Sequence, residues 1–163
     1  MRRISRICLV FFLYLVFASA QASLSDFDGR TARLADYTGN GSWTLVMIWS
    51  ATCGTCHREA PRIEAFHQRH ENAGVEVLGI SVDGLEGVMN ARRFVHQNRL
   101  TFRNLVGDAE DVALLYLDTT GTHLLGTPGF LLFKPRGRLR TFSVGPVDVG
   151  RLDRIVGDSS LVH

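Results

Sequence analysis

The feature that most constrains the fold is a pair of cysteines placed where a buried strand gives way to a helix. Cys53 and Cys56 follow a nearly continuous apolar run, Trp43 to Ser50, of the kind that forms a strand covered on both faces. Behind them, a helical pattern runs from Glu59 to His70. A helix N-terminus has unpaired N–H groups and a partial positive charge, so it stabilises a thiolate. The sequence therefore predicts a reactive Cys53, with Cys56 one turn further on and close enough to form a disulfide with it.

Residues 1–22 have the pattern of a secretory signal peptide. Three arginines lie in the first six residues, and an apolar run follows from Ile7 to Phe17. Small residues around Ala20 then offer a cleavage site. The run is short for a membrane span, and the alternative, an uncleaved N-terminal anchor, would leave the domain outside the cytoplasm as well. We therefore expect a protein exported to the periplasm, with residues 23–163 as its mature part.

Export also changes the charge and the cysteine content. The leader contains three arginines, no acidic residue and Cys8, so its removal turns the formal net charge of +2 into a slight acidic excess. The basic character of the whole chain is therefore no argument for a nucleic-acid partner, and we expect none. The mature part keeps only Cys53 and Cys56, which would close too small a loop to stabilise the fold much. A purely structural disulfide is thus the weaker interpretation of the pair.

The mature part is expected to form one α/β domain. No repeat, low-complexity segment or linker divides it, and strand-like runs alternate with helical patterns, which indicates a partly parallel sheet covered on both faces. A turn signal at Asp28-Gly29 predicts an N-terminal β-hairpin over 27–34. Further strands are expected over 43–50, 75–82, 101–106, 130–133 and 138–144, the last two antiparallel, and helices over 59–70, 85–97, 108–116 and 148–156, with a helical turn at 35–39.

The cysteine pair is compatible with several functions. A redox dithiol needs an exposed, reactive first thiol and a partner one turn away, which the strand-to-helix position supplies. The run Cys53-Gly-Thr-Cys56-His57 also matches the attachment pattern of c-type haem, but an alternating strand–helix context leaves no room for haem at a sheet edge. A zinc site would need four ligands, and only two cysteines are present. A passive disulfide or metal clip in a non-catalytic binding or chaperone module is the other class of function. We expect neither a cofactor nor a metal ion.

Two further features are candidates for a site around the dithiol. Glu59 lies three residues after Cys56 and so on the same helical face, where it either exchanges a proton with the second thiol or faces solvent. Pro128 stands just before the strand at 130–133, as a proline that begins a strand must, because its nitrogen cannot join the ladder. If the Thr127–Pro128 bond is cis, this loop can lie against the dithiol and offer backbone groups to a substrate chain. An ordinary trans bond is the alternative.

Together these residues resemble the thioredoxin superfamily, and within it the exported TlpA/ResA/CcmG-like branch. The resemblance extends from about Phe27 to Gly157 and is carried by four stretches, 34–39, 48–61 with the Cys-x-x-Cys pair, 77–83, and 126–133 with the Thr-Pro dipeptide. It implies a thioredoxin-like fold, with a central mixed sheet flanked by helices, an N-terminal β-hairpin and an inserted helix. It also implies the activity of a thiol–disulfide oxidoreductase.

The resemblance further implies roles for individual residues. Cys53 would be the attacking thiolate, Cys56 the resolving thiol and Glu59 an acidic catalytic residue beside them. The surface that meets the substrate would comprise Trp49, Thr127 and Pro128, the proline in cis. Members of the branch commonly reduce disulfides of partner proteins outside the cytoplasm, often in cytochrome c assembly, and receive electrons from a membrane donor. We expect the same kinds of partner here, and a monomer.

Two positions depart from the family pattern. Thr52 stands where the family usually has a tryptophan before the first cysteine, and Gly129 stands where a threonine often follows the cis-proline. Both positions flank the substrate-facing surface. The departures leave the exchange chemistry intact and leave the identity of the partner open.

Overall fold

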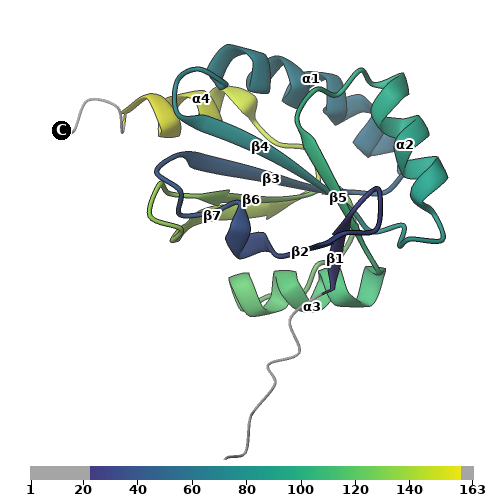
Figure 1. Ribbon diagram of the computed structural model, residues 1–163. Coiled ribbons are helices and arrows are strands. Elements are labelled where there is room, and N and C mark those ends of the chain that lie inside the picture. The colour runs from purple at the N-terminus through teal and green to yellow at the C-terminus, as the bar shows by residue number, and fades with distance from the viewer. Residues whose placement is uncertain (1–22, 159–163) are drawn as a thin grey trace, which may run out of the picture.

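The structure is a computed structural model that describes residues 23–158 (Figure 1). Its centre is a seven-stranded sheet with the strand order β2-β1-β5-β4-β3-β6-β7. The strands are β1 (Leu24–Asp26), β2 (Thr31–Ala32), β3 (Trp43–Trp49), β4 (Val75–Ser81), β5 (Arg103–Gly107), β6 (Gly129–Phe133) and β7 (Leu139–Val144). The helices are α1 (Gly54–His70), α2 (Val88–Gln97), α3 (Ala109–Thr120) and α4 (Val149–Asp158), with a short 3-10 helix, η1, over Leu34–Asp36.

The sheet is mixed, as the sequence predicts. Strands β3, β4 and β5 run parallel to one another, whereas β6 pairs with β3 and β7 in antiparallel fashion. At the other edge, β1 and β2 form the N-terminal hairpin and β1 adds antiparallel to β5. The carboxyl ends of β3 and β4 therefore meet at the same edge of the sheet, next to the start of β6.

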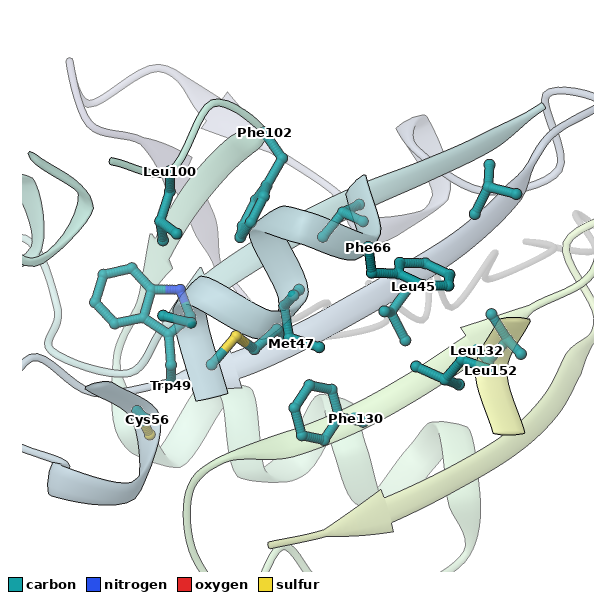
Figure 2. Packing of buried hydrophobic residues seen from close by; sticks show 14 of the residues in the cluster. Leu45, Met47, Trp49, Cys56, Phe66, Leu100, Phe102, Phe130, Leu132 and Leu152 are labelled. Atoms are coloured by element: carbon teal, nitrogen blue, oxygen red, sulfur yellow. The ribbon is translucent and has the colours of Figure 1, made fainter. Parts of the chain in front are cut away.

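Strand β3 lies inside the sheet, and all seven of its residues are buried. Its successive side chains point to opposite faces. Leu45, Met47 and Trp49 pack with residues of α1, α2 and α4 in one hydrophobic cluster, whereas Val46 and Ile48 pack in a second cluster beneath α3. Figure 1 shows the three resulting layers, and Figure 2 shows the first cluster from close by. This burial fixes the end of β3, and with it the chain that leads to the cysteines.

Several helix ends differ from the predicted ones. Helix α1 begins at Gly54, ahead of the apolar periodicity, and α2 begins at Val88 rather than at 85. The later start of α2 follows from a turn that contains Gly84, with a φ of +67°, and Gly87, where a Cβ would collide with the backbone of Asp83. Glycines therefore set this boundary, which the apolar spacing alone does not mark.

Helix α3 also departs from its prediction at its C-terminal end. It continues past Tyr116 to Thr120 and ends at Gly121, whose φ of +74° is easily adopted by glycine. Asp108 is its N-cap residue, but the side chain makes no capping hydrogen bond.

The predicted signal peptide, residues 1–22, lies outside the residues that the structure describes, as do residues 159–163. Within residues 23–158, none of the helices combines the length and the apolar character that a membrane crossing requires.

Candidate active site

Cys53 and Cys56 form a disulfide at the start of α1. Cys53 is the N-cap residue, with extended backbone angles (φ −81°, ψ 107°), and its Sγ accepts a hydrogen bond from the Cys56 N–H at 3.0 Å. Cys53 is partly exposed, whereas Cys56 is fully buried. The predicted junction is thus confirmed. An incoming disulfide can reach the first sulfur but not the second, and the helix terminus directs an N–H at the first sulfur, where it would stabilise negative charge.

Asp83 holds the turn that leads from β3 into the disulfide. Its carboxylate accepts hydrogen bonds from Ser50 Oγ (2.7 Å), from the Ala51 N–H (2.8 Å) and from Ser81 Oγ (2.6 Å). Ser50 Oγ in turn accepts from the Thr52 N–H at 3.3 Å. Sequence reasoning gave Asp83 no role. The available signal was its place directly after a buried strand that runs parallel to β3, since the carboxyl ends of parallel strands share one edge.

The Thr127–Pro128 peptide bond is cis, and its loop lies against the disulfide. The Thr127 carbonyl oxygen is 3.3 Å from Cys53 Sγ, a position in which it can accept a hydrogen bond from a Cys53 thiol. Thr127 is half-buried and Pro128 is buried, and the contact of this loop with a substrate stays a prediction. At Gly129 a Cβ would lie 2.7 Å from Leu124 Cδ1, so the end of the Leu124 side chain would have to shift to admit a larger residue there.

Glu59 is buried one turn after Cys56, but it contacts neither cysteine by a hydrogen bond in the part of the chain that the structure describes. Oε1 accepts from Arg62 Nη1 at 3.0 Å, and Oε2 accepts from the Val147 N–H at 3.1 Å. The alternative of a solvent-facing glutamate is therefore wrong. Its role as a proton acceptor stays a prediction.

Trp49 is fully buried, so its predicted contact with a substrate is not met. Its ring stacks on Phe94 with centroids 4.1 Å apart, and its Nε1–H donates to Asn104 Oδ1 at 3.1 Å. Gly79 leaves the room for this pair, because a Cβ there would collide with the Asn104 side chain. The physical reason for the correction is position: Trp49 is the last residue of β3 and points into the layer beneath α1 and α2 (Figure 2).

His57 bears on the haem alternative, which would use it as an axial ligand. Its Nε2 is 3.1 Å from the Ala51 carbonyl oxygen, and its Nδ1 is 3.2 Å from Asn98 Nδ2. Because a carbonyl only accepts, Nε2 carries the proton and Nδ1 accepts from the amide. Both ring nitrogens are thus already used within the protein, and this arrangement does not fit a haem ligand. Among residues 23–158, no group of three or more His, Cys, Asp or Glu side chains is placed to hold a metal ion.

Comparison with known proteins gives relatives of one kind. The chain is 35% identical over 91 residues to the thiol-disulfide oxidoreductase ResA of Geobacillus thermodenitrificans, which covers 56% of this chain and 49% of that protein. It is 25% identical over 135 residues to ResA of Oceanobacillus iheyensis, covering 80% of this chain and 63% of that protein. The match thus spans between about half and two thirds of these relatives' length.

A solved structure supports the fold independently. A secreted disulfide oxidoreductase of Mycobacterium tuberculosis, described as homologous to DsbE of E. coli, superposes with a TM-score of 0.65 at 20% identity, over 85% of this chain and 96% of that one. The predicted resemblance to the thioredoxin superfamily and its ResA-like branch is confirmed by these matches. The family model of the AhpC/TSA family matches residues 18–142, and the chain, with its thioredoxin-like fold, therefore belongs to the AhpC/TSA family.

Proposed function

We propose that this protein is an extracytoplasmic thiol–disulfide oxidoreductase that reduces disulfides in partner proteins. The observation that carries the proposal is the position of the cysteines, with a partly exposed Cys53 at the N-terminus of α1, Cys56 buried behind it and the cis Thr127–Pro128 loop alongside. The names of the curated relatives support the same chemistry. In contrast, a passive clip would not need an exposed first sulfur at a helix N-terminus.

The reaction begins from the dithiol form. The Cys53 thiolate attacks one sulfur of the partner's disulfide, a bond forms between the two proteins, and the partner's other sulfur leaves as a thiolate that takes up a proton. The Cys56 N–H that points at Cys53 Sγ in the structure stabilises the attacking thiolate before the bond forms. The Thr127 carbonyl is placed to accept from the Cys53 thiol before it loses its proton.

The second step releases the partner. Cys56 loses its proton and attacks Cys53 Sγ, the mixed disulfide breaks, and the partner's second sulfur leaves as a thiolate that takes up a proton. Two electrons and two protons have then passed from the Cys53–Cys56 dithiol to the partner. Glu59 is proposed to accept the Cys56 proton. A carboxylate has lone pairs for about four hydrogen bonds, so the bonds from Arg62 and Val147 leave it capacity to accept another.

The finer parts of the proposal concern location and partners. The pattern of residues 1–22 supports export to the periplasm as a single mature domain, and the M. tuberculosis protein of similar fold is itself described as secreted. Outside the cytoplasm a donor must return the disulfide to the dithiol, so we propose a membrane-bound thiol reductant as electron source. A partner in cytochrome c assembly follows from the sequence resemblance. An oxidised Cys-x-x-Cys-His peptide is the substrate that would test it.

Reduction of insulin with dithiothreitol as the donor tests the activity. The wild-type protein is expected to accelerate precipitation of the insulin B chain, and Cys53→Ser is expected to reduce the rate to that of dithiothreitol alone. Thr55→Ala, a change between the two cysteines that keeps both, is the matched control for damage to the helix start. An unchanged rate in Cys53→Ser would exclude the proposal.

Trapping in the native host identifies partners. Cys56→Ala cannot complete the second step, so it is expected to accumulate mixed disulfides with partner proteins, which non-reducing gels and mass spectrometry detect. Cys53→Ser/Cys56→Ala should trap none. If Cys56→Ala captures no adducts from intact cells and the wild-type protein does not accelerate insulin reduction, the passive-clip alternative is the correct one.

A further inference from the structure

A pocket of about 320 Å³ opens beside Thr52, the residue that precedes Cys53. One wall is the turn that precedes Cys53, formed by Ala51 and Thr52, and the other is helix α2, which contributes Asn90, Arg93, Phe94 and Gln97. Thr52 is exposed and is bonded in sequence to the attacking cysteine. The pocket therefore lies within reach of a partner chain that is joined to Cys53.

The floor of the pocket is a buried aromatic ring, and polar side chains line the wall that α2 forms. Phe94 is 1% exposed and stacks on Trp49, so the floor is part of the hydrophobic cluster beneath α2. Asn90, Arg93 and Gln97 follow one another at spacings of three and four, which places them on one face of the helix, and all three are exposed. On the opposite wall, the Ala51 N–H is held by Asp83.

The charge beside the pocket is positive and has no acidic partner. Helix α2 contains two arginines and no acidic residue. Arg92 is paired with Asp28, but Arg93 donates only to the neutral Asn90 side chain, at 3.2 Å, and no carboxylate within residues 23–158 forms an ion pair with it. The carboxylates of Asp83 and Glu59 are already bonded to other groups.

We propose that this pocket binds an aspartate or glutamate side chain of the partner protein, next to the cysteine that Cys53 attacks. An arginine has five N–H donors in a planar arrangement that matches a carboxylate with two parallel hydrogen bonds, and Arg93 uses only one of them in the structure. Thr52 has a small side chain, so the pocket stays open between the turn and α2. The inference rests on the proposed function, because it names the feature by which that reaction selects its partner.

Reduction rates of synthetic peptides test the proposal. Each peptide contains one intramolecular disulfide, with Glu, Gln or Lys placed before or after one cysteine, and the reduced protein, freed of small thiols, is the only reductant. At low salt the Glu peptide of at least one placement is expected to react about fivefold faster than its Lys counterpart, with Gln between them, and the difference should shrink at high salt because it is electrostatic.

Variants assign the preference to the pocket. Arg93→Gln is expected to erase the difference between the Glu and Lys peptides, Arg93→Glu to reverse it, and Thr52→Trp to narrow it by filling the space. Arg136→Gln, an exposed arginine in the β6–β7 turn, removes the same charge outside the pocket and should keep the preference. Equal rates for all peptides, or an equal loss of preference in Arg136→Gln, would overturn the proposal while leaving the exchange activity established. If no peptide reacts at all, both the pocket and the proposed function are wrong.

Discussion

Two carboxylates flank the dithiol, one on the β4 side and one on α1, and they are held in different ways. Asp83 accepts its hydrogen bonds from uncharged groups, two of them in the turn that leads into Cys53. Glu59 accepts one backbone N–H from Val147 and pairs with Arg62, whose side chain is 55% exposed. An exposed guanidinium can exchange its partner for water at little cost, whereas the carboxylate of Asp83 holds together three donors from two strand ends, one of them the buried hydroxyl of Ser81. Asp83 is therefore suited to hold geometry, and Glu59 to exchange a proton.

The largest effect is expected for Asp83→Ala. The change leaves the Ala51 N–H and two hydroxyl groups without their acceptor, which should cost about 2 to 3 kcal/mol in the free energy of unfolding, measured in urea. The attack by Cys53 should also slow, because the turn before it is released. Asp83→Asn retains one acceptor oxygen and should lose about half as much. Equal stability of Asp83→Ala and the wild type would remove the distinction between the two carboxylates.

Glu59→Gln should give the opposite combination of effects. A glutamine oxygen can still accept from Val147, so the free energy of unfolding should fall by less than about 1 kcal/mol. Release of the partner from the mixed disulfide should slow about tenfold or more, because the amide cannot take the Cys56 proton. Single-turnover kinetics separate attack from release. Slowed attack with normal release would show that Glu59 is a structural residue like Asp83.

The smallest effect is expected for Asp153→Asn. This change tests whether α1, the helix that contains Glu59, is held to α4 by a further contact. Asp153 joins α4 to α1 through His70 (2.7 Å) and Arg69 (3.2 Å). Its partial burial acts to raise its pKa, but the hydrogen bonds from His70 and Arg69 outweigh burial, so the pKa lies below its ordinary value. Because the pair is partly exposed, the change should cost about 0.5 kcal/mol at neutral pH.

The same pKa shift gives a dependence on pH. A carboxyl with a lowered pKa in the folded state contributes stability above its ordinary value of 3.8, and this contribution is lost as the pH falls through the lowered pKa. The difference in stability between the wild type and Asp153→Asn should therefore be present at pH 6 and close as the solution is acidified below about pH 4. A difference independent of pH would mean that the effect is not ionic.

The sequence was most informative where local pattern and burial agree. The run at 43–50 has no charge and continues on both faces, so it could be read as a central strand, and β3 is one. The start of α1 was harder, because the residues from Gly54 to Arg58 carry no apolar periodicity and the N-cap is a cysteine rather than one of the usual capping residues. Local pattern thus located the cysteines but not what holds them.

Contacts between distant segments account for what the sequence did not predict. The bond from Val147 to Glu59 joins residues 88 positions apart, and no spacing rule reaches that far. The role of Asp83 emerges only from the parallel register of β3 and β4, in which Trp49 lies opposite Ser81. The burial of Trp49 likewise depends on Phe94 and Asn104, from a helix and a strand that come later in the chain.

The tie between the end of β7 and the cis-proline loop has a consequence for how the chain matures. Gly145 donates its N–H to the Pro128 carbonyl at 2.8 Å, and two residues later Val147 reaches Glu59. During synthesis the cysteines emerge long before either contact can form. A growing or truncated chain that stops short of residue 145 would therefore carry both thiols without these two contacts. The surroundings of the dithiol are thus completed only by the segment that follows the last strand, well after the cysteines themselves have been made.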